Sequence, residues 1–324
     1  MKVTVIIPNY NGFRFLKDCL TSLENQSTKE FETLVIDNAS SDESVTYIKE
    51  NFPNVKLMVM EKNLGFSGGV NVGIQAAKTP YVLLLNNDTE VDKYFVEEMV
   101  KAIEKSPNIF SVSSKMIQFY NREKLDDAGD LYGILGWGFQ RGIDAPADSY
   151  TKCEEIFSAC AGAAIYRTDV FKQIGYFDEM HFAYLEDIDV GYRGKIAGYK
   201  NMYCPTAIVY HVGSGTSGSK YNSFKVKLAA RNSVYLNYKN MPMIQLIINS
   251  IPLALGWLLK WRFFKKNGFE KEYVEGLKEG FATRKKCRKV PFEMKHLKNY
   301  IVIEWQLIKN MFIYCIEFGK RKIK

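Results

Sequence analysis

Residues 1–115 alternate between short apolar runs and longer amphipathic segments. Four of the runs have the length and composition of buried strands, and the segments between them repeat apolar residues at helical spacing. The pattern predicts strands at 3–8, at the start of 31–40, at 55–61 and at 81–88, and helices at 13–26, 41–52 and 67–78. Strands that alternate with helices in this way are joined by right-handed crossovers. The sequence therefore predicts an α/β fold with a mainly parallel sheet flanked by helices.

Polar side chains stand where each predicted strand ends. Pro8 and Tyr10 follow the first strand, Asp37 the second, Asn63 the third, and the run Asn86-Asn87-Asp88 the fourth. In open α/β sheets, ligands bind beyond the carboxyl ends of the strands. We therefore expect these side chains to line one ligand site.

The segment YVLLLNNDTEVD, which begins at Tyr81, ends a wholly apolar strand in two amides and one carboxylate. A rigid strand would deliver the Asp88 carboxylate to the edge of the sheet, which suits a metal ligand. Asp and Asn are also good N-caps, so the same residues could simply begin the next helix. The segment alone leaves both interpretations open.

Net charge divides the chain into two parts. Residues 220–324 contain 23 Lys and Arg against 7 Asp and Glu, whereas residues 1–219 contain 21 against 29. A basic region favours a polyanionic partner, either nucleic acid or an anionic membrane. Residues 241–266 combine an apolar stretch with Trp257, Trp261 and flanking basic side chains, as interfacial helices do. We therefore expect an anionic membrane surface, and no nucleic acid, as the partner of this region.

Two stretches of the basic region allow other interpretations. Residues 241–266 are interrupted by prolines and polar residues, whereas a membrane span needs about 20 predominantly apolar residues. Besides interfacial contact, a packed helix or a true span stays open for them. Residues 300–324 end in a basic cluster and suit either an interfacial helix or a terminal helix docked on the domain.

The cysteines and the N-terminal residues indicate the cellular compartment of the protein. The six cysteines are scattered, without the spacing of a zinc site or a disulfide framework, which favours a reducing cytosol. The first residues enter a strand directly and lack the apolar region and cleavage site of a signal peptide. With the basic region, these features lead us to expect a cytoplasmic protein held peripherally at the inner face of the cell membrane.

Seven motifs occur in a fixed order along most of the chain. They read VIIPNYNG, VIDNASSDES, NLGFSGGVNVGI, LLLNNDTEVD, GAAIYRTDVFKQIGYFDE, YLEDIDVGYR and VYHVGSGTSG. This order resembles the inverting nucleotide-sugar glycosyltransferases of family two, which have the GT-A fold, and most of all the branch that contains bacterial rhamnosyltransferases. The resemblance covers about residues 3–235. It implies a GT-A domain at 1–220 and a helical, basic, membrane-associating region at 221–324.

The resemblance implies a divalent metal on the donor diphosphate. Asp88 fills the carboxylate position of the family's metal motif, and His211 matches a metal-binding His of the family. An all-oxygen site that touches phosphate suits Mg²⁺ or Mn²⁺, and an imidazole is more usual on Mn²⁺ than on Mg²⁺. Asn86 is expected to contact the ribose or to support the ligand, with Asn87 beside it. A histidine hydrogen-bonded at a strand end is the alternative for His211, and the glycines and serines after it would close over the diphosphate.

Recognition of the nucleoside is assigned to the ends of the first three strands. A carboxylate at Asp37 would accept the N3–H of uracil or thymine, a proton that cytosine lacks. Tyr10, after Pro8, offers a face on which the base can stack. The family resemblance places three further residues near the nucleotide, although the first of them is also a candidate helix cap: Asp42, Asn63 and Asn71.

The motif YLEDIDV supplies the predicted catalytic base. Transfer with inversion needs a group that takes the proton of the acceptor hydroxyl as it attacks the anomeric carbon. Asp187 matches the base of the family, Glu186 is the next candidate, and like charges nearby could raise the pKa of Asp187. Asp189 is expected to pair with Arg193 one turn later. The alternative is an acidic, solvated helix start.

These features predict transfer of a sugar from a dTDP- or UDP-sugar to a hydroxyl of a lipid-linked or cell-surface glycan acceptor, and we expect the acceptor to be polyprenyl-diphosphate-linked. On resemblance alone, the best candidate for the sugar is L-rhamnose. A UDP-hexose or UDP-N-acetylhexosamine transferase of the same family is an alternative, as is a non-catalytic membrane-associated scaffold. A nucleotidyltransferase would need a basic Gly-rich loop near the N-terminus, which PNYNGFRF does not provide.

Overall fold

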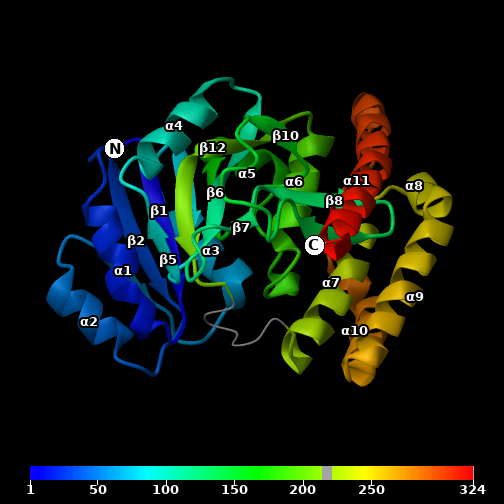
Figure 1. The fold of residues 1–324 in the computed structure, drawn as a ribbon, viewed down its shortest axis with the longest axis horizontal. Helices are drawn as coiled ribbons and strands as arrows, with labels where there is room; N and C mark the ends of the chain where they lie inside the picture. Colours follow the sequence, from blue (N-terminus) through cyan, green and yellow to red (C-terminus); the bar gives the residue numbers. More distant parts are fainter. Residues whose placement is uncertain (214–220, 324) are drawn as a thin grey trace.

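The computed structural model describes residues 1–213 and 221–323, and their main feature is one mixed sheet (Figure 1). Its strands run in the order β10-β12-β6-β11-β4-β1-β2-β3. In chain order they are β1 (Val3–Asn9), β2 (Phe31–Asp37), β3 (Lys56–Val59), β4 (Tyr81–Leu85), β6 (Ile109–Gln118), β10 (Glu154–Ile156), β11 (Ala163–Arg167) and β12 (Lys200–His211). Two short strands extend the sheet: β5 (Thr89–Val91) pairs with β12, and β7 (Leu125–Asp127) pairs with β6.

The parallel arrangement predicted from residues 1–115 is confirmed for β1 to β4. β1 pairs in parallel with both β2 and β4, and β2 pairs in parallel with β3. Beyond β4 the sheet becomes mixed, because β11 lies antiparallel to both β4 and β6. The predicted α/β fold class is therefore confirmed, with the parallel part of the sheet confined to its N-terminal strands and to the β6–β12 pair.

Helices cover both faces of the sheet, so the central strand β4 is buried on both sides. They are α1 (Phe13–Glu24), α2 (Ser44–Asn51), α3 (Gly65–Ala76), α4 (Phe95–Glu104), α5 (Thr168–Ile174) and α6 (Glu186–Ile196). Alternate residues of β4 enter different cores: Leu83 packs with residues of α1 and α4, and Leu84 with residues of α3 and α5. A strand buried on both faces reads as a continuous hydrophobic run, which explains the sequence of β4.

Close approach of α3 to the sheet depends on a glycine. A Cβ at Gly73 would lie 2.5 Å from Cγ2 of Ile6 on β1, so a larger residue would push the helix away. The helix begins at Gly65, whose φ of +73° suits glycine, and the Asn63 side chain accepts the Gly65 N–H at 2.8 Å. The Gly-rich segment is therefore explained first by tight packing of α3 on β1.

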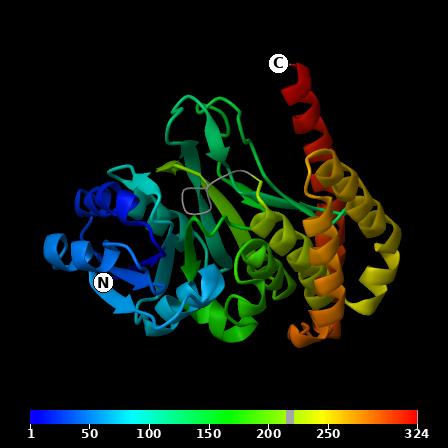
Figure 2. The ribbon, with the colours of Figure 1, turned by 90° about the horizontal axis from the view of Figure 1, so that it is seen from below.

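The C-terminal helices form a layer at one end of the sheet, to the right in Figures 1 and 2. They are α7 (Ser223–Asn240), α8 (Met243–Ile248), α9 (Ser250–Lys266), α10 (Glu270–Thr283) and α11 (Leu297–Ile323). Between them and the sheet lies a separate hairpin, β8 (Asp130–Gly133) and β9 (Trp137–Gln140). Three 3₁₀ turns complete the described elements: η1 (Glu179–His181), η2 (Arg284–Lys286) and η3 (Met294–His296).

A third core joins the C-terminal helices to the hairpin and α6. It contains Tyr132 of β8, Tyr192 of α6, Leu236 of α7 and Leu307 of α11, all essentially buried. The backbone N–H of Ile134 donates to the Leu307 carbonyl at 3.1 Å. The predicted boundary near residue 220 stays a prediction, since the two parts share this core. Among the described helices, none combines the length and the apolarity that crossing a bilayer requires.

Candidate active site

The ends of β1, β2 and β4 are joined by buried amide and carboxylate side chains. Asn9 Nδ2 donates to Asp37 Oδ2 at 2.9 Å, and Asn87 Nδ2 donates to Asn9 Oδ1 at 2.7 Å. The second oxygen of Asp37 accepts the Ser40 N–H at 2.9 Å. A Cβ at Gly12 would lie only 1.9 Å from Asn87 Nδ2, so the loop before α1 needs glycine there. Asn9 was not among the predicted site residues, although it stands between Pro8 and Tyr10.

Asp37 is fully buried in this network, with both carboxylate oxygens already accepting hydrogen bonds. Contact with a base would require one of them to accept a second hydrogen bond. Tyr10 is 39% exposed at the same strand end, and Pro8 is half-buried, so the ring of Tyr10 is accessible to a planar ligand. The roles assigned to these three residues stay predictions.

Asp42 and Asn63 each hold a loop next to a helix. The Asp42 carboxylate accepts the Phe13 N–H at 3.0 Å and the Ser44 N–H at 3.1 Å, and so ties α1 to the start of α2. Partial burial opposes ionisation of Asp42, but hydrogen bonds from Ser44 and Phe13 outweigh it and lower its pKa. The capping interpretation of Asp42 thus has a geometric basis. Asn63 starts α3 in a similar way, through Gly65.

Asn71 holds the segment that leads into η1. Its amide nitrogen donates to the Phe177 carbonyl at 2.9 Å and to Glu179 Oε1 at 3.1 Å, and its oxygen accepts the Phe177 N–H at 3.0 Å. The amide therefore makes its contacts within the protein, and its predicted contact with the nucleotide stays a prediction.

Asp88 and His211 come together at the edge where β4 ends and β12 ends. Their side chains approach at 3.3 Å, from Asp88 Oδ1 to His211 Nε2. The other ring nitrogen, Nδ1, lies 2.8 Å from Asp126 Oδ2 on β7. A carboxylate on Nδ1 is the arrangement that directs the lone pair of Nε2 toward a metal. The donor set of Asp88 and His211 therefore fits a divalent cation, with Asp126 orienting the imidazole.

These same contacts govern the charge of His211 in the metal-free protein. Burial opposes the charged imidazole, but hydrogen bonds to Asp126 and Asp88 outweigh burial and raise the His211 pKa to about 10. The ring is then an imidazolium shared between two carboxylates. Because a metal takes only the neutral imidazole, a bound cation has to displace this proton.

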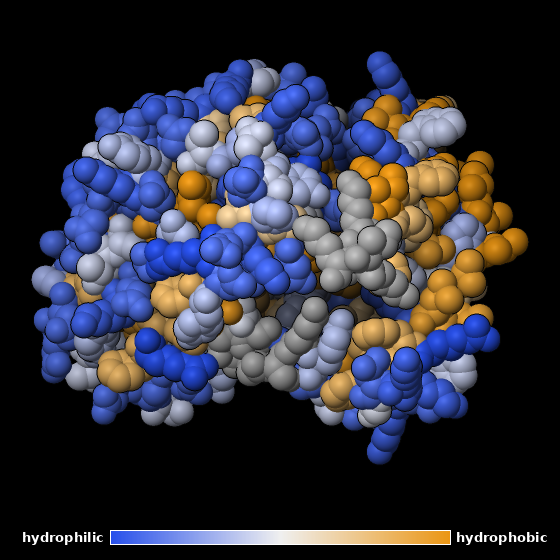
Figure 3. All heavy atoms as spheres, viewed as in Figure 1, coloured by the Kyte–Doolittle hydropathy of each residue, from blue (hydrophilic) through white to orange (hydrophobic). Residues whose placement is uncertain are grey.

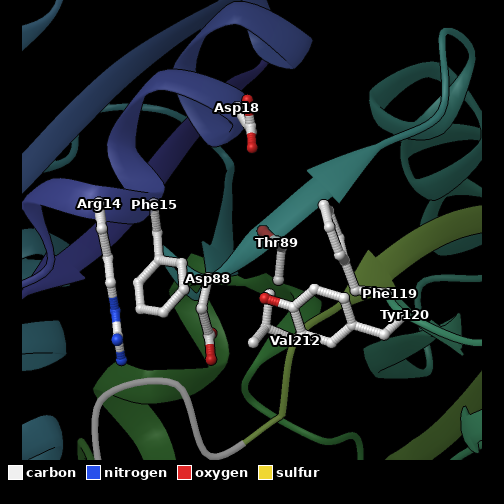
Figure 4. A pocket seen from close by; sticks show the side chains of 8 residues that line it. All are labelled: Arg14, Phe15, Asp18, Asp88, Thr89, Phe119, Tyr120 and Val212. Carbon is white, nitrogen blue, oxygen red and sulfur yellow. The ribbon is translucent and has the colours of Figure 1, made fainter.

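A pocket of about 160 Å³ opens beside Asp88 (Figure 4). Its lining comes from α1, from the turn after β4 and the start of β5, from the loop after β6 and from the end of β12: Arg14, Phe15, Asp18, Asp88, Thr89, Phe119, Tyr120 and Val212. Figure 4 shows the side chains of Arg14 and Asp88 extending in the same direction, while Asp18 lies apart from both. A cation next to the candidate metal ligand suits an anionic ligand. Sequence reasoning missed Arg14, because it lies on α1 rather than at a strand end.

Two further elements complete the surroundings of Asp88. Lys225 on α7 is near enough for its charge to interact with that of Asp88, although burial lowers the Lys225 pKa overall. Asn86 donates its backbone N–H to the Gly162 carbonyl at 2.8 Å, which fixes the turn after β4 against β11. The glycine and serine loop predicted to close over the diphosphate falls largely at 214–220, outside the described residues.

Asp187 stands in the first turn of α6, after a strained backbone segment. Tyr184 and Leu185 have φ values of +72° and +68°, which side-chain-bearing residues seldom adopt. Asp187 Oδ1 accepts the Ile188 N–H at 2.7 Å, and Ser158 Oγ donates to the Asp187 carbonyl at 2.5 Å. Strain of this kind persists where surrounding contacts hold it, often at functional sites. The strained turn fixes the position of the Asp187 carboxylate.

Burial raises the pKa values of the acidic side chains at the start of α6. It raises the pKa of Asp187 above the ordinary aspartate value, and it raises that of Glu186 well above its usual range, with the Asp187 charge adding to the effect. Glu186 Oε2 has no hydrogen-bond partner among the described residues. Both candidates thus lie in surroundings that strengthen a carboxylate as a base.

A second pair of buried carboxylates lies beside Asp187. Asp127 and Asp130 have carboxylate oxygens within 4.8 Å of each other and of the Cys160 sulfur. Burial, followed by the nearby Asp126 charge, raises the pKa of Asp127 to about 8; burial and the Asp127 charge raise that of Asp130 well above normal. The run DDAGD at 126–130 is the sequence signal for this pair, which is not among the predicted site residues.

Asp189 ties α6 to α7 through buried hydrogen bonds. It is fully buried and receives hydrogen bonds from Arg193 at 2.7 Å, from Lys239 at 3.0 Å and from Asn240 at 2.7 Å. Although burial opposes its ionisation, the charges of Arg193 and Lys239 lower its pKa. The predicted Asp189–Arg193 pair is present.

His181 makes the stability of the fold sensitive to acid. Burial lowers its pKa to about 4, from an ordinary value near 6.5, and neither ring nitrogen has a hydrogen-bond partner among the described residues. The folded chain therefore keeps His181 neutral down to about pH 4, whereas the unfolded chain protonates it below about pH 6.5. Its contribution to stability is complete above that pH and declines as the pH falls from about 6.5 to about 4.

We expect protonation of His181 in the unfolded chain to lower the free energy of unfolding by about 2 kcal/mol when the pH falls from about 7.5 to 5. The variant His181→Phe keeps a ring against Tyr235 and cannot titrate. Urea denaturation at both pH values should therefore show a smaller loss for the variant than for the wild type, whatever their absolute stabilities. Equal losses in the two proteins would contradict the buried neutral histidine.

The sheet order, the helices on both of its faces and the acidic side chains at its carboxyl edge define a glycosyltransferase of the GT-A type. Residues 4–175 match the sequence model described as glycosyl transferase family 2, and the chain belongs to that family. The family predicted from the seven motifs is thus confirmed.

Relatives support the same placement. The chain is 25% identical over 280 residues to the low-salt glycan biosynthesis hexosyltransferase Agl10 of Haloferax volcanii, covering 82% of this chain and 85% of that protein. It is 24% identical over 237 residues to N-acetylglucosaminyl-diphospho-decaprenol L-rhamnosyltransferase of Mycobacterium tuberculosis, covering 66% of this chain and 77% of the relative.

Solved structures share the fold. TarS 1-349 of S. aureus, crystallised with UDP-GlcNAc, gives a TM-score of 0.58 at 19% identity. The match covers 88% of this chain and 81% of the TarS chain. The mannosyltransferase PcManGT of Pyrobaculum calidifontis, crystallised with GDP-Man and Mn²⁺, gives a TM-score of 0.55 at 14% identity. The match covers 93% of this chain and 79% of PcManGT.

Proposed function

We propose that the protein transfers a sugar, with inversion, from a dTDP- or UDP-sugar to a hydroxyl of a lipid-linked glycan acceptor. The observation that carries this proposal is the presence of two separate acidic centres. One is Asp88, directed at His211 Nε2; the other is Asp187, fixed on a strained turn with a raised pKa. The first suits the leaving diphosphate and the second suits the attacking hydroxyl.

Departure of the nucleotide needs positive charge at the diphosphate. Asp88 and His211 would hold Mg²⁺ or Mn²⁺, and the ion when bound neutralises the charge that develops on the leaving group. Arg14 extends beside Asp88 in the same pocket and would bind a phosphate oxygen directly. Asp126 keeps the His211 ring oriented.

Attack on the anomeric carbon needs a base on the opposite side of the sugar. Asp187 would accept the proton of the acceptor hydroxyl as the new glycosidic bond forms and the bond to the diphosphate breaks. A raised pKa favours this proton transfer, because a carboxylate that is poised nearer neutrality is a stronger base. Glu186 is the second candidate for this role.

The donor is assigned to a pyrimidine with an N3–H because of Asp37. Uracil and thymine both offer that proton, whereas cytosine does not. L-Rhamnose is the preferred sugar, supported by the mycobacterial relative named as an L-rhamnosyltransferase. A hexose is the second candidate, supported by the haloarchaeal relative named as a hexosyltransferase. A polyprenyl-diphosphate-linked acceptor would place the enzyme at the inner face of the membrane.

Nucleotide selectivity provides the test of the donor assignment. With Mn²⁺ present, dTDP and UDP at about 100 times their dissociation constants should stabilise the protein by about 2.7 kcal/mol, and CDP at the same concentration should not. For a chain of 324 residues, that free energy should raise the melting temperature by about 4 °C. Differential scanning calorimetry measures the shift, and a panel of dTDP- and UDP-sugars identifies the sugar by slow hydrolysis. Equal stabilisation by CDP would refute the role of Asp37.

A further inference from the structure

One face of α8 and α9 consists almost wholly of exposed aliphatic side chains. Ile244, Ile247, Ile248 and Ile251 are 64–79% exposed, and Leu255 and Leu258 are about 45% exposed. They recur at intervals of three and four residues, so they form one continuous stripe along the two helices. Aliphatic side chains of this size are normally buried in the folded protein. A contiguous exposed patch of them marks an interaction surface.

A second stripe lies on α11. Ile301, Trp305, Phe312 and Ile316 are 52–68% exposed and recur at helical spacing, while Leu307 on the opposite side of the helix is buried. Hydrogen bonds hold α8 and α9 against this helix, since Gln245 and Asn249 both donate to Glu304. Figure 3 shows the resulting band of hydrophobic surface over the C-terminal helices. We call the two stripes together the apolar face.

All charged side chains of residues 241–269 are cationic. Residues 241–269 contain no Asp or Glu, and α9 ends in Lys260, Arg262, Lys265 and Lys266. The two acids on the described part of α11 are turned to the protein: Glu304 binds α8 and α9, and Glu317 accepts from the Tyr150 hydroxyl at 2.7 Å. Aliphatic and aromatic side chains bordered by basic residues match the interface of an anionic bilayer.

The charge pattern disfavours a second copy as the occupant. A symmetric dimer brings the same surface of both chains together, and residues 241–269 of either copy offer no acid to the basic end of α9, where Glu270 already pairs with Lys265. Like charges set against each other weaken such a contact.

The apolar face is connected to the predicted base through the β8–β9 hairpin. Trp137 Nε1 donates at 3.1 Å to the carbonyl of Gly256, on the side of α9 that is buried against the hairpin. Next to Trp137, Gly138 packs so closely on Ile188 that a Cβ there would lie 2.3 Å from Ile188 Cδ1. Ile188 in turn donates its N–H to Asp187. The hairpin therefore lies between α9, whose other side carries the apolar face, and the predicted base.

We propose that the apolar face of α8, α9 and α11 inserts into the interfacial layer of an anionic membrane leaflet, which presents a lipid-linked acceptor to Asp187 along the β8–β9 hairpin. The membrane docking rests only on the helices; the acceptor route rests on the proposed function. An interfacial position agrees with the finding that none of the described helices suits a span.

Vesicle flotation of the full chain tests the docking. Extruded vesicles of phosphatidylcholine alone, and with about a quarter phosphatidylglycerol, are the probes. Two double variants change exposed side chains only: Ile247→Ser with Ile251→Ser, and Ile301→Ser with Trp305→Ser. Val59→Ser with Tyr94→Ser is the matched control, since both side chains are about half exposed and lie outside the C-terminal helices. We expect each stripe variant to lower the partition coefficient on anionic vesicles at least tenfold, and the control to leave it unchanged.

Two other measurements separate the possible failures. Slow hydrolysis of the donor in solution should be equal in wild type and stripe variants, so its absence in the wild type would refute the proposed function and not the docking. Flotation that is absent in the wild type, or unchanged in both stripe variants, overturns the docking. A wild-type dimer in sedimentation velocity that the stripe substitutions convert to a monomer, without a change in flotation, would assign the face to a second copy and also overturn it.

Discussion

Asparagine in place of Asp187 is expected to lower the rate of sugar transfer about 10³-fold while leaving donor affinity within about twofold, because general base catalysis contributes about 10²–10⁴. The amide has nearly the same shape and its oxygen can still accept the Ile188 N–H, so the turn before α6 should persist. What the amide cannot do is take the proton of an acceptor hydroxyl. Single-turnover assays with saturating donor measure the transfer step, and calorimetry measures donor binding.

The neighbouring carboxylate provides the control. Glu186→Gln removes a negative charge at the adjacent position, and we expect its transfer rate to fall less than about tenfold if Asp187 is the base. The raised pKa of Asp187 also predicts a pH profile: the rate should rise with pH through a limb above the ordinary aspartate pKa, because only the ionised form accepts a proton. Near-normal transfer by Asp187→Asn, with the loss appearing in Glu186→Gln, would move the base to Glu186.

The N-terminal half of the fold was predictable because its elements differ in hydrophobic period. β4 is wholly apolar since it is buried on both faces, and α1 keeps its apolar residues on one side. β6 is different. Ser111, Ser113 and Ser114 are fully buried in it, and Ser111 is satisfied by a hydrogen bond to Asn201 on β12 at 2.8 Å. A buried polar residue that is stabilised by a distant partner gives no local signal in the sequence.

The residues of the candidate site also divide into those that local sequence predicts and those that depend on distant contacts. Asp88 was found from its place at the end of an apolar strand, a rule that needs only local sequence. His211 was assigned through the family resemblance, because the pairing of β5 with β12 that brings it to Asp88 is a long-range feature. Asp126 and Arg14 were missed for a related reason: each reaches the site from an element whose own pattern is unremarkable, and only tertiary structure shows what it contacts.

Alanine in place of Asp88, or removal of divalent ions with EDTA, is expected to lower the transfer rate by about 10³-fold, the scale on which positioned positive charge acts on a developing anion. Mn²⁺ or Mg²⁺ should restore the EDTA-treated wild type and not Asp88→Ala. Asp18→Asn is the matched control. It removes one negative charge from the same pocket, but its side chain lies apart from Asp88 and Arg14, so we expect activity within about twofold of wild type.

A binding measurement makes the test independent of activity. In the metal-free protein the His211 imidazolium is paired with both Asp88 and Asp126, so a metal that occupies Nε2 must release a proton. Calorimetric titration of Mn²⁺ in buffers of different ionisation enthalpy should detect that release near pH 7.5 in the wild type. Asp88→Ala should bind Mn²⁺ at least tenfold more weakly. Full transfer activity in EDTA, or undiminished Mn²⁺ binding by Asp88→Ala, would show that the sugar leaves its diphosphate without an ion held at this edge of the sheet.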